Sequence, residues 1–230
     1  MSKTNAGPNP KTVTIYGRLS FPNFNHAQAV VRNQKSNFPK ADPNEVTPDF
    51  NMLVEGPQLE KLKNHVLNEY LPFVVARKAA GETRDALTQA EADRIIKLIE
   101  SGDWEAQPPY IPIKVVPEKT VELAPEAVAS IKINGNRGED MELKAIVRDE
   151  SELLVPDPDI LKFPVIKPIG QTVHQMYGGC YVVATLNLYS FVSGKLPGFS
   201  ASASVCVFKQ DGDRFGGGVA LDEEAMFLDE

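Results

Sequence analysis

Residues 179–191 have the sequence Gly-Cys-Tyr-Val-Val-Ala-Thr-Leu-Asn-Leu-Tyr-Ser-Phe, and this stretch decides the fold class. Small and aliphatic side chains occupy every second position and form one face of an extended chain: Cys180, Val182, Ala184, Leu186 and Leu188. The opposite face carries aromatic and polar side chains: Tyr181, Val183, Thr185, Asn187, Tyr189 and Phe191. This period of two predicts a long, half-buried β-strand.

Similar patterns on both sides of this strand extend the β prediction. A turn over 194–198 leads into an expected partner strand over 199–208. Four earlier segments also read as strands: 12–20, 50–55, 131–133 and 141–148. The predicted class is therefore α+β and mostly β, and these strands are compatible with a small five-stranded barrel that carries a helical insertion. The pattern alone does not distinguish a barrel from an open sheet.

Two helices are expected between the second and third of these strands. Pro57 suits the first turn of a helix, and Pro72 is expected to end it. Thr88 and Glu91 have the spacing of a capping box, which opens a second helix that ends near Gly102. Residues 21–48 are rich in Pro, Asn and Lys and predict a long loop, and about 57–128 is expected to be a helical and proline-rich insertion.

Charge is distributed unevenly along the 230 residues, whose net charge is −7. The first 41 residues hold six basic side chains and no acidic one, and the last nine hold five acids and no base. Such asymmetry favours a polyanion as partner and a separate interaction tail. We therefore expect a disordered segment over 1–10, one domain over 11–218 and an acidic tail over 219–230.

Several kinds of chemistry lack the residues they need. There is no phosphate-binding P-loop motif, and the three histidines and two cysteines are not at metal-ligand spacing, so no metal or cofactor is expected. With a hydrophobic content of 42% and no run of about 18 apolar residues, neither full disorder nor a transmembrane helix is expected. An enzyme is not expected. The loop carboxylates of Asp157 and Asp159 nevertheless leave a metal-dependent nuclease as an alternative hypothesis.

Aromatic and basic side chains share the polar faces of the predicted strands. Tyr16 lies on the same strand face as Arg18, and Tyr189 on the same face as Asn187. Aromatic rings on a polar face stack on nucleobases without reading their sequence. Arg18 would neutralise phosphates beside them, together with Lys144 and Arg148. The alternative is that these rings form a second core layer, in a sheet covered on both faces.

Three pieces of the chain resemble one protein family. They are Tyr177-Gly-Gly-Cys-Tyr181, Asn187-Leu-Tyr-Ser-Phe191 and Asp211-Gly-Asp-Arg-Phe-Gly-Gly217. The chain resembles the tailed-phage single-stranded DNA-binding proteins, a family long labelled a domain of unknown function. The resemblance implies an oligonucleotide/oligosaccharide-binding (OB) fold, which is a five-stranded antiparallel barrel, here with inserted helices and an acidic C-terminal tail. The resemblance is specific over 176–218, loose over 13–71 and weak over 75–170.

The resemblance implies a protein that coats single-stranded DNA during phage replication and recombination, in the cytoplasm of the infected bacterial host. The residues expected to bind DNA, from motif membership and strand face, are Tyr16, Arg18, Lys144, Arg148, Tyr177, Tyr181, Asn187, Tyr189, Phe191 and Arg214. The family's acidic tail would recruit replication proteins such as a polymerase or a helicase-primase. The tail residues are Asp222, Glu223, Glu224, Met226, Phe227, Leu228, Asp229 and Glu230.

Two features of this assignment leave room for another function. The tail ends in Asp229 and Glu230 rather than in an aromatic residue, which departs from the family's pattern. A fold also does not determine a function. The alternative is a phage structural or assembly protein that uses the same β scaffold to bind protein partners.

Overall fold

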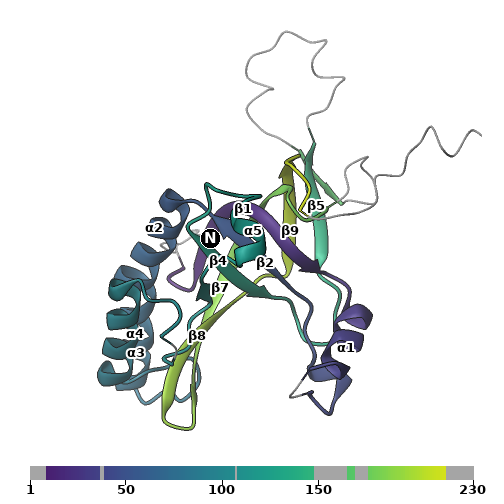
Figure 1. The fold of residues 1–230 in the computed structure, drawn as a ribbon. Helices are drawn as coiled ribbons and strands as arrows, with labels where there is room; N and C mark the ends of the chain where they lie inside the picture. Colours follow the sequence, from purple (N-terminus) through teal and green to yellow (C-terminus); the bar gives the residue numbers. More distant parts are fainter. Residues whose placement is uncertain (1–8, 37–38, 107, 148–164, 169–175, 216–230) are drawn as a thin grey trace, which may run out of the picture.

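The computed structural model describes most of the chain (Figure 1). The described residues are 9–36, 39–106, 108–147, 165–168 and 176–215. Several predicted features lie outside the described residues. They are most of the expected disordered N-terminus, Arg148, the carboxylates at 157 and 159, and the whole acidic tail. The domain boundaries at 10/11 and 218/219 therefore stay predictions.

Five strands close into a barrel. They are β1 (Thr12–Asn23), β2 (Asp49–Val54), β4 (Ala129–Asn134), β8 (Leu196–Ser202) and β7 (Tyr181–Ser193), paired in that order. The β7 strand pairs back to β1 and so closes the ring. Four of the five ladders are antiparallel and the β4–β8 ladder is parallel. This barrel, with helices inserted between its strands, confirms the predicted mostly-β fold class.

The alternating patterns place their apolar faces inside the barrel, as predicted. The inward side chains of β7 are fully buried, and Val13, Ile15 and Leu19 of β1 meet them in the core. Burial of each such aliphatic side chain stabilises the fold by about 1.5–3 kcal/mol. Gly17 lies where β1 runs beside β2, and a Cβ atom there would stand 2.2 Å from the Leu53 carbonyl oxygen. Only glycine therefore allows this approach.

The partner strand expected over 199–208 is in fact two strands. The strand is interrupted at Ala203 and Ser204, which follow β8, and the chain continues as β9 (Val205–Gln210). Both strands pair with β7, as expected, but their partners on the other side differ: β8 runs parallel to β4, whereas β9 runs parallel to β5 (Glu142–Val147). Two short strands complete the sheet: β6 (Val165–Pro168) pairs with β5, and β3 (Ile113–Lys114) pairs with β4.

The first predicted helix does not end at Pro72. Helix α2 (Gly56–His65) continues through a π-helical turn, η2 (Val66–Tyr70), into α3 (Leu71–Ala79). The Leu71 amide donates to the Val66 carbonyl, five residues back. This wider turn carries the chain past Pro72, which has no N–H and whose ring would clash with a regular helix.

The second helix, α4 (Gln89–Ser101), has the predicted capping box between Thr88 and Glu91, and Gly102 ends it with a φ of 68°. After it comes one short helix, α5 (Glu118–Val121). Helices α2, α3 and α4 lie together on one side of the barrel, and a further helix lies on the other side (Figure 1).

That further helix, α1 (His26–Gln34), lies where a loop over 21–48 was predicted, followed by the short 3₁₀ turn η1 (Pro43–Glu45). It is a polar helix that buries little more than Ala29. A residue far away in the sequence supports its first turn, since the His26 amide donates to the Asp140 carboxylate at 2.6 Å. The loop prediction was wrong because this support comes from a residue far away in the sequence.

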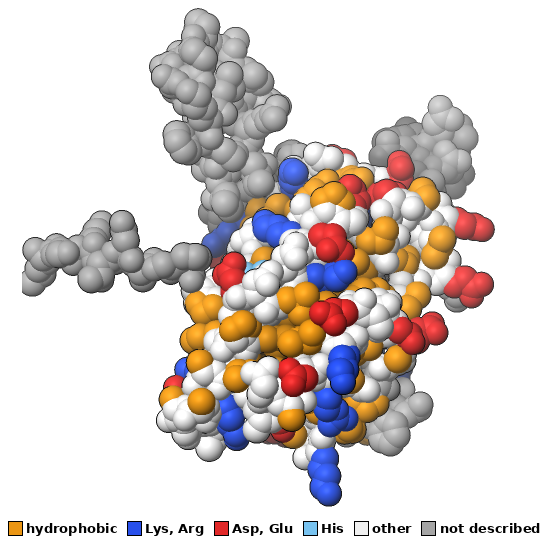
Figure 2. Space-filling view, turned by 90° about the vertical axis from the view of Figure 1, so that its left-hand side faces the viewer, with side chains coloured by type: hydrophobic (Ala, Val, Ile, Leu, Met, Phe, Trp, Pro, Cys, Tyr) orange, Lys and Arg blue, Asp and Glu red, His pale blue; other side chains and the backbone are white. Residues whose placement is uncertain are grey.

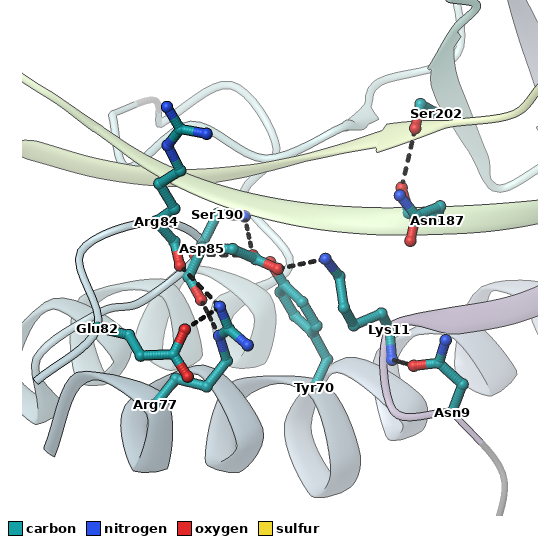
Figure 3. Close-up of polar contacts among 10 residues, drawn as sticks. All are labelled: Asn9, Lys11, Tyr70, Arg77, Glu82, Arg84, Asp85, Asn187, Ser190 and Ser202. Atoms are coloured by element: carbon teal, nitrogen blue, oxygen red, sulfur yellow. Dashed lines mark hydrogen bonds and ion pairs between the residues drawn. The ribbon is translucent and has the colours of Figure 1, made fainter. Parts of the chain in front are cut away.

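One carboxylate fastens the helices to the barrel (Figure 3). Asp85 accepts hydrogen bonds from the Tyr70 hydroxyl at 3.0 Å and the Ser190 amide at 2.8 Å, and pairs with the Lys11 ammonium at 2.6 Å. Burial alone would raise the pKa of Asp85, but these three partners outweigh it and hold the pKa below its usual value. Asp85 therefore links the helical insertion to β7 and to Lys11, the residue that precedes β1.

Candidate nucleic-acid interface

A basic groove crosses the outer face of β2 and β4, and we call it the α1 groove. It encloses about 590 Å³ between α1, the following connection and the two strands. Its lining residues are Ala29, Arg32, Asn33, Lys35, Ser36, Lys40, Val46, Thr47, Asp49, Asn51, Lys132 and Asn134. Strand alternation places Asn51 and Lys132 side by side on the outer face, while their neighbours in sequence point into the core.

Four cations and one carboxylate line the α1 groove. Asp49 pairs with Arg32 and lies 3.4 Å from the Lys132 ammonium. The Lys40 ammonium donates to the Glu45 carbonyl at 2.5 Å. The side chains of Arg32 and Lys132 remain 54% and 50% exposed. An open groove with excess positive charge attracts anions from solution.

A second groove, which we call the β7 groove, lies on the outer face of β7. It also encloses about 590 Å³, and its lining residues are Thr12, Asn136, Lys144, Val183, Thr185, Asn187, Ser202, Ala203, Ser204, Val205 and Val207. Two residues expected to bind DNA, Lys144 and Asn187, are thereby brought together. Lys144 is 30% exposed and pairs with Glu142 at 3.1 Å. The rest of the groove is neutral and polar or aliphatic.

Several predicted binding residues meet in a different place, which we call the aromatic cluster. The rings of Tyr16 and Tyr181 stack with their centroids 6.0 Å apart. Lys209 lies 4.0 Å above the Tyr16 ring, and the Arg18 guanidinium lies 5.6 Å from the Tyr181 ring and 4.5 Å from the Phe215 ring. The cluster therefore alternates rings and cations across β1, β7 and β9.

Arg18, which was expected to neutralise phosphates, is buried, and only 6% of this residue is exposed. Its guanidinium donates to the carbonyl oxygens of Gly179, Leu123 and Asp213 and to the carboxylate of Glu126, at 2.8–3.2 Å. These contacts use four of the five N–H donors of the side chain. Arg18 therefore holds three segments of the chain against the barrel, and its contact with DNA stays a prediction.

Acidic side chains lie close to the aromatic cluster. Burial, and after it the neighbouring Glu55, Tyr181 and Glu126, raise the pKa of Tyr16. A small recess beside the stacked rings is lined by the same two glutamates. The tyrosines here are half-buried, and their surroundings are less favourable to a polyanion than the α1 groove.

Tyr177 and Arg214 form a neighbouring pair. The Tyr177 hydroxyl donates to the Asp211 carboxylate at 2.8 Å and accepts from the Gly212 amide at 3.2 Å. Burial is the largest cause that raises the pKa of Tyr177. The exposed Arg214 guanidinium lies 4.5 Å from the Tyr177 ring. Tyr177 is thus fixed by its hydroxyl, while Arg214 covers its face.

Tyr189 presents the most open ring of the predicted set. It is 37% exposed, whereas Phe191 is half-buried and stacks on Tyr110 at 6.4 Å between centroids. The residue across the ladder from Tyr189 is Ser200, whose side chain is short. Tyr189 therefore leaves part of its side chain open to solvent.

Sequence reasoning missed the cations of the α1 groove and Lys209. Arg32, Lys35 and Lys40 belong to the basic N-terminal block, which was the available signal, but Lys132 comes from a strand about 90 residues later. The helical face of the molecule differs from the groove, because there basic, acidic and hydrophobic side chains are interspersed (Figure 2). Arg148 lies outside the described residues.

A metal centre needs several ligating side chains close together, and a membrane span needs a long apolar helix. Among the residues that the structure describes, no group of three or more His, Cys, Asp or Glu side chains is placed to hold a metal ion. None of the described helices is long and apolar enough to cross a membrane.

No protein-family model and no curated protein matches the chain. Its fold is similar to the single-stranded DNA-binding protein from bacteriophage Enc34, at 12% identity over 94% of this chain and 90% of that chain, with a TM-score of 0.48. The Enc34 protein in complex with ssDNA gives 13% identity, 90% of each chain and a TM-score of 0.48. The gp2.5 single-stranded DNA-binding protein of bacteriophage T7 gives 10% identity, 96% of each chain and 0.43. Similarity at this level carries no weight for function.

Proposed function

We propose that this protein binds single-stranded DNA without sequence preference. The observation that carries the proposal is the α1 groove, which lies on the outer face of the second and third barrel strands, β2 and β4. OB barrels bind oligonucleotides on this face and on the loop between strands one and two. Here that loop is the connection from β1 to β2, which supplies Arg32, Lys35 and Lys40.

Binding would combine two physical effects. The groove cations would neutralise phosphates and release counterions, which makes the affinity depend on salt but not on sequence. Bases would stack on exposed rings, at about 1–3 kcal/mol for each base. Tyr189 is the best placed of these rings. The other residues that the sequence predicted to bind DNA, on β1, on β7 and beside β7 at Tyr177 and Arg214, would flank the bound strand.

We also carry forward the biological assignment as part of this proposal. The protein would act in phage DNA replication and recombination, in the cytoplasm of the infected host. Its acidic tail, 222–230, would recruit replication proteins such as a polymerase or a helicase-primase. The support for these finer assignments is the motif resemblance together with the charge asymmetry of the chain.

The proposal is tested by fluorescence anisotropy with labelled dT15 at several salt concentrations. Lys35→Glu/Lys132→Glu should weaken binding at least about tenfold and reduce the salt slope by about 1.4, since each lost phosphate contact removes about 0.7. The matched control is Lys61→Glu/Lys97→Glu, which changes net charge equally on the exposed helical face.

Each outcome of this titration has a consequence. Equal loss in both double variants would mean that only net charge matters and that the α1 groove is not the site. No binding by the unmodified protein at low salt would reject the proposal and favour the assembly-protein alternative. Degradation of the labelled strand when Mg²⁺ or Mn²⁺ is added would instead indicate a nuclease.

A further inference from the structure

The α1 groove and the β7 groove meet at the parallel ladder between β4 and β8. Asn134 lines the first groove and Ser202 lines the second. These two residues are partners in the ladder. The Asn134 side-chain amide also donates to the Ser200 hydroxyl at 3.1 Å, so it contacts the outer face of β8. The two grooves are therefore neighbours on one continuous surface.

The surface between the grooves carries short, polar side chains. Along β8, the outward Ser200 and Ser202 alternate with the buried Phe199, Ala201 and Ala203. The Ser202 hydroxyl donates to the backbone carbonyl of Asn187 at 3.3 Å (Figure 3). Because both outward side chains are short, no tall side chain of β8 stands between the grooves.

Cations lie at the two ends of this surface, and neutral groups lie between them. Lys132 is at the β4 end and Lys144 at the β5 end. On β7, Asn187 faces Ser202 and Tyr189 faces Ser200 across the ladder. Amides and hydroxyls hydrogen-bond to bases and sugars without adding repulsive charge. The exposed Tyr189 ring supplies a stacking partner at the crossing.

We propose that the two grooves form one track for a single strand. The strand is held by the cations of the α1 groove, crosses β8 over Ser200 and Ser202 beside Tyr189, and ends near Lys144 in the β7 groove. This inference rests on the proposed function and adds to it a path and a length. Neighbouring strands are about 4.8 Å apart, so the three ladder steps from β2 to β7 alone span about 14 Å.

A track of this kind makes affinity depend on oligonucleotide length. A very short strand fills one groove, and a longer strand fills both. Once the α1 groove is occupied, contact with the β7 groove becomes intramolecular and is favoured by effective concentration. We therefore expect variants at the crossing and in the β7 groove to weaken the binding of long strands selectively.

The experiment compares dT4 and dT15 binding to Ser202→Glu and Lys144→Glu by anisotropy at low salt. Both variants should bind dT4 within about twofold of the unmodified protein and bind dT15 about tenfold more weakly. Lys97→Glu, on the exposed face of α4 and outside both grooves, is the charge-matched control for Lys144→Glu and should bind both lengths as the unmodified protein does. Thermal melting shows whether Ser202→Glu remains folded, and Lys144→Glu decides the matter if it does not.

The outcomes separate the track from the function it rests on. If Lys144→Glu and a folded Ser202→Glu bind dT15 as the unmodified protein does, while Lys35→Glu/Lys132→Glu binds it weakly, the strand does not cross β8. The track is then wrong and the proposed function stands. If the unmodified protein binds neither length, the proposed function fails and the track fails with it.

Discussion

The α1 groove and the aromatic cluster both lie on the outer surface of the barrel, and both contain arginine. In the groove, the Arg32 side chain is 54% exposed and its one carboxylate partner is shared with a lysine. In the cluster, the Arg18 side chain is 7% exposed and binds three carbonyls and a carboxylate. The same residue type is available to a ligand in one region and occupied by the protein in the other.

The difference follows from the cost of burying a charge. A guanidinium removed from water must have nearly all its donors satisfied, so Arg18 is surrounded by acceptors and rings. An exposed arginine keeps its hydration and gives it up when a phosphate binds. We infer that the aromatic cluster mainly stabilises the fold, and that the α1 groove mainly serves to bind the proposed ligand, single-stranded DNA.

The largest expected effect is on stability, from Arg18→Ala. The change leaves the Glu126 carboxylate and three carbonyls without their donor, so the free energy of unfolding should fall by about 3–5 kcal/mol. Urea denaturation measures this, with Arg32→Ala as the control, which should cost less than about 1 kcal/mol. Weak DNA binding by a fully stable Arg18→Ala protein would show instead that Arg18 contacts the phosphates directly.

The next effect compares two tyrosines of the same strand. Tyr189→Ala should weaken dT15 binding by about 1–3 kcal/mol and change stability little, because its ring is exposed. Tyr181→Ala should lower stability instead, since it removes the stack on Tyr16 and the Arg18 contact. Anisotropy and urea denaturation on both variants test this. The comparison breaks down if Tyr181→Ala loses more affinity than Tyr189→Ala while remaining equally stable.

The smallest effect is a gain. Asp49→Asn removes the carboxylate that competes with phosphates for Arg32 and Lys132, so dT15 affinity should rise about two- to fivefold at low salt and little at high salt. Asp93→Asn on the exposed face of α4 is the charge-matched control and should change nothing. A loss of affinity in Asp49→Asn would mean that Asp49 positions the cations rather than competing with their ligand.

The sequence predicted those parts of the fold whose signals are local. The alternation in β1 and β7 and the capping box at Thr88 involve residues within one element, and the structure confirms them. Helix α1 was missed because it buries little more than Ala29, and because Asp140, in the connection between β4 and β5, supports its first turn from far away in the sequence. The break between β8 and β9 was missed because both strands pair with β7 and the change of partner, from β4 to β5, occurs on their other side.

The candidate site was harder to predict for the same reason. The basic N-terminal block was visible in the sequence, but the α1 groove also needs Lys132, which only the β2–β4 ladder brings to it. The aromatic residues of β7 were identified, but their exposure depends on partners such as Tyr110 and Ser200. The sequence therefore predicted which types of residue the candidate site contains, but not which of their side chains are exposed to a ligand.

Closure of the barrel also determines when the molecule becomes complete during synthesis. The β1 strand pairs with β7 through partners such as Thr12 and Asn187, which are far apart along the chain. Contacts of such long range form slowly, and an unpaired strand edge is prone to wrong pairing. A nascent chain that has not reached Asn187 therefore carries an open β1 edge. The surface that we assign to DNA exists only after the last barrel strand has left the ribosome.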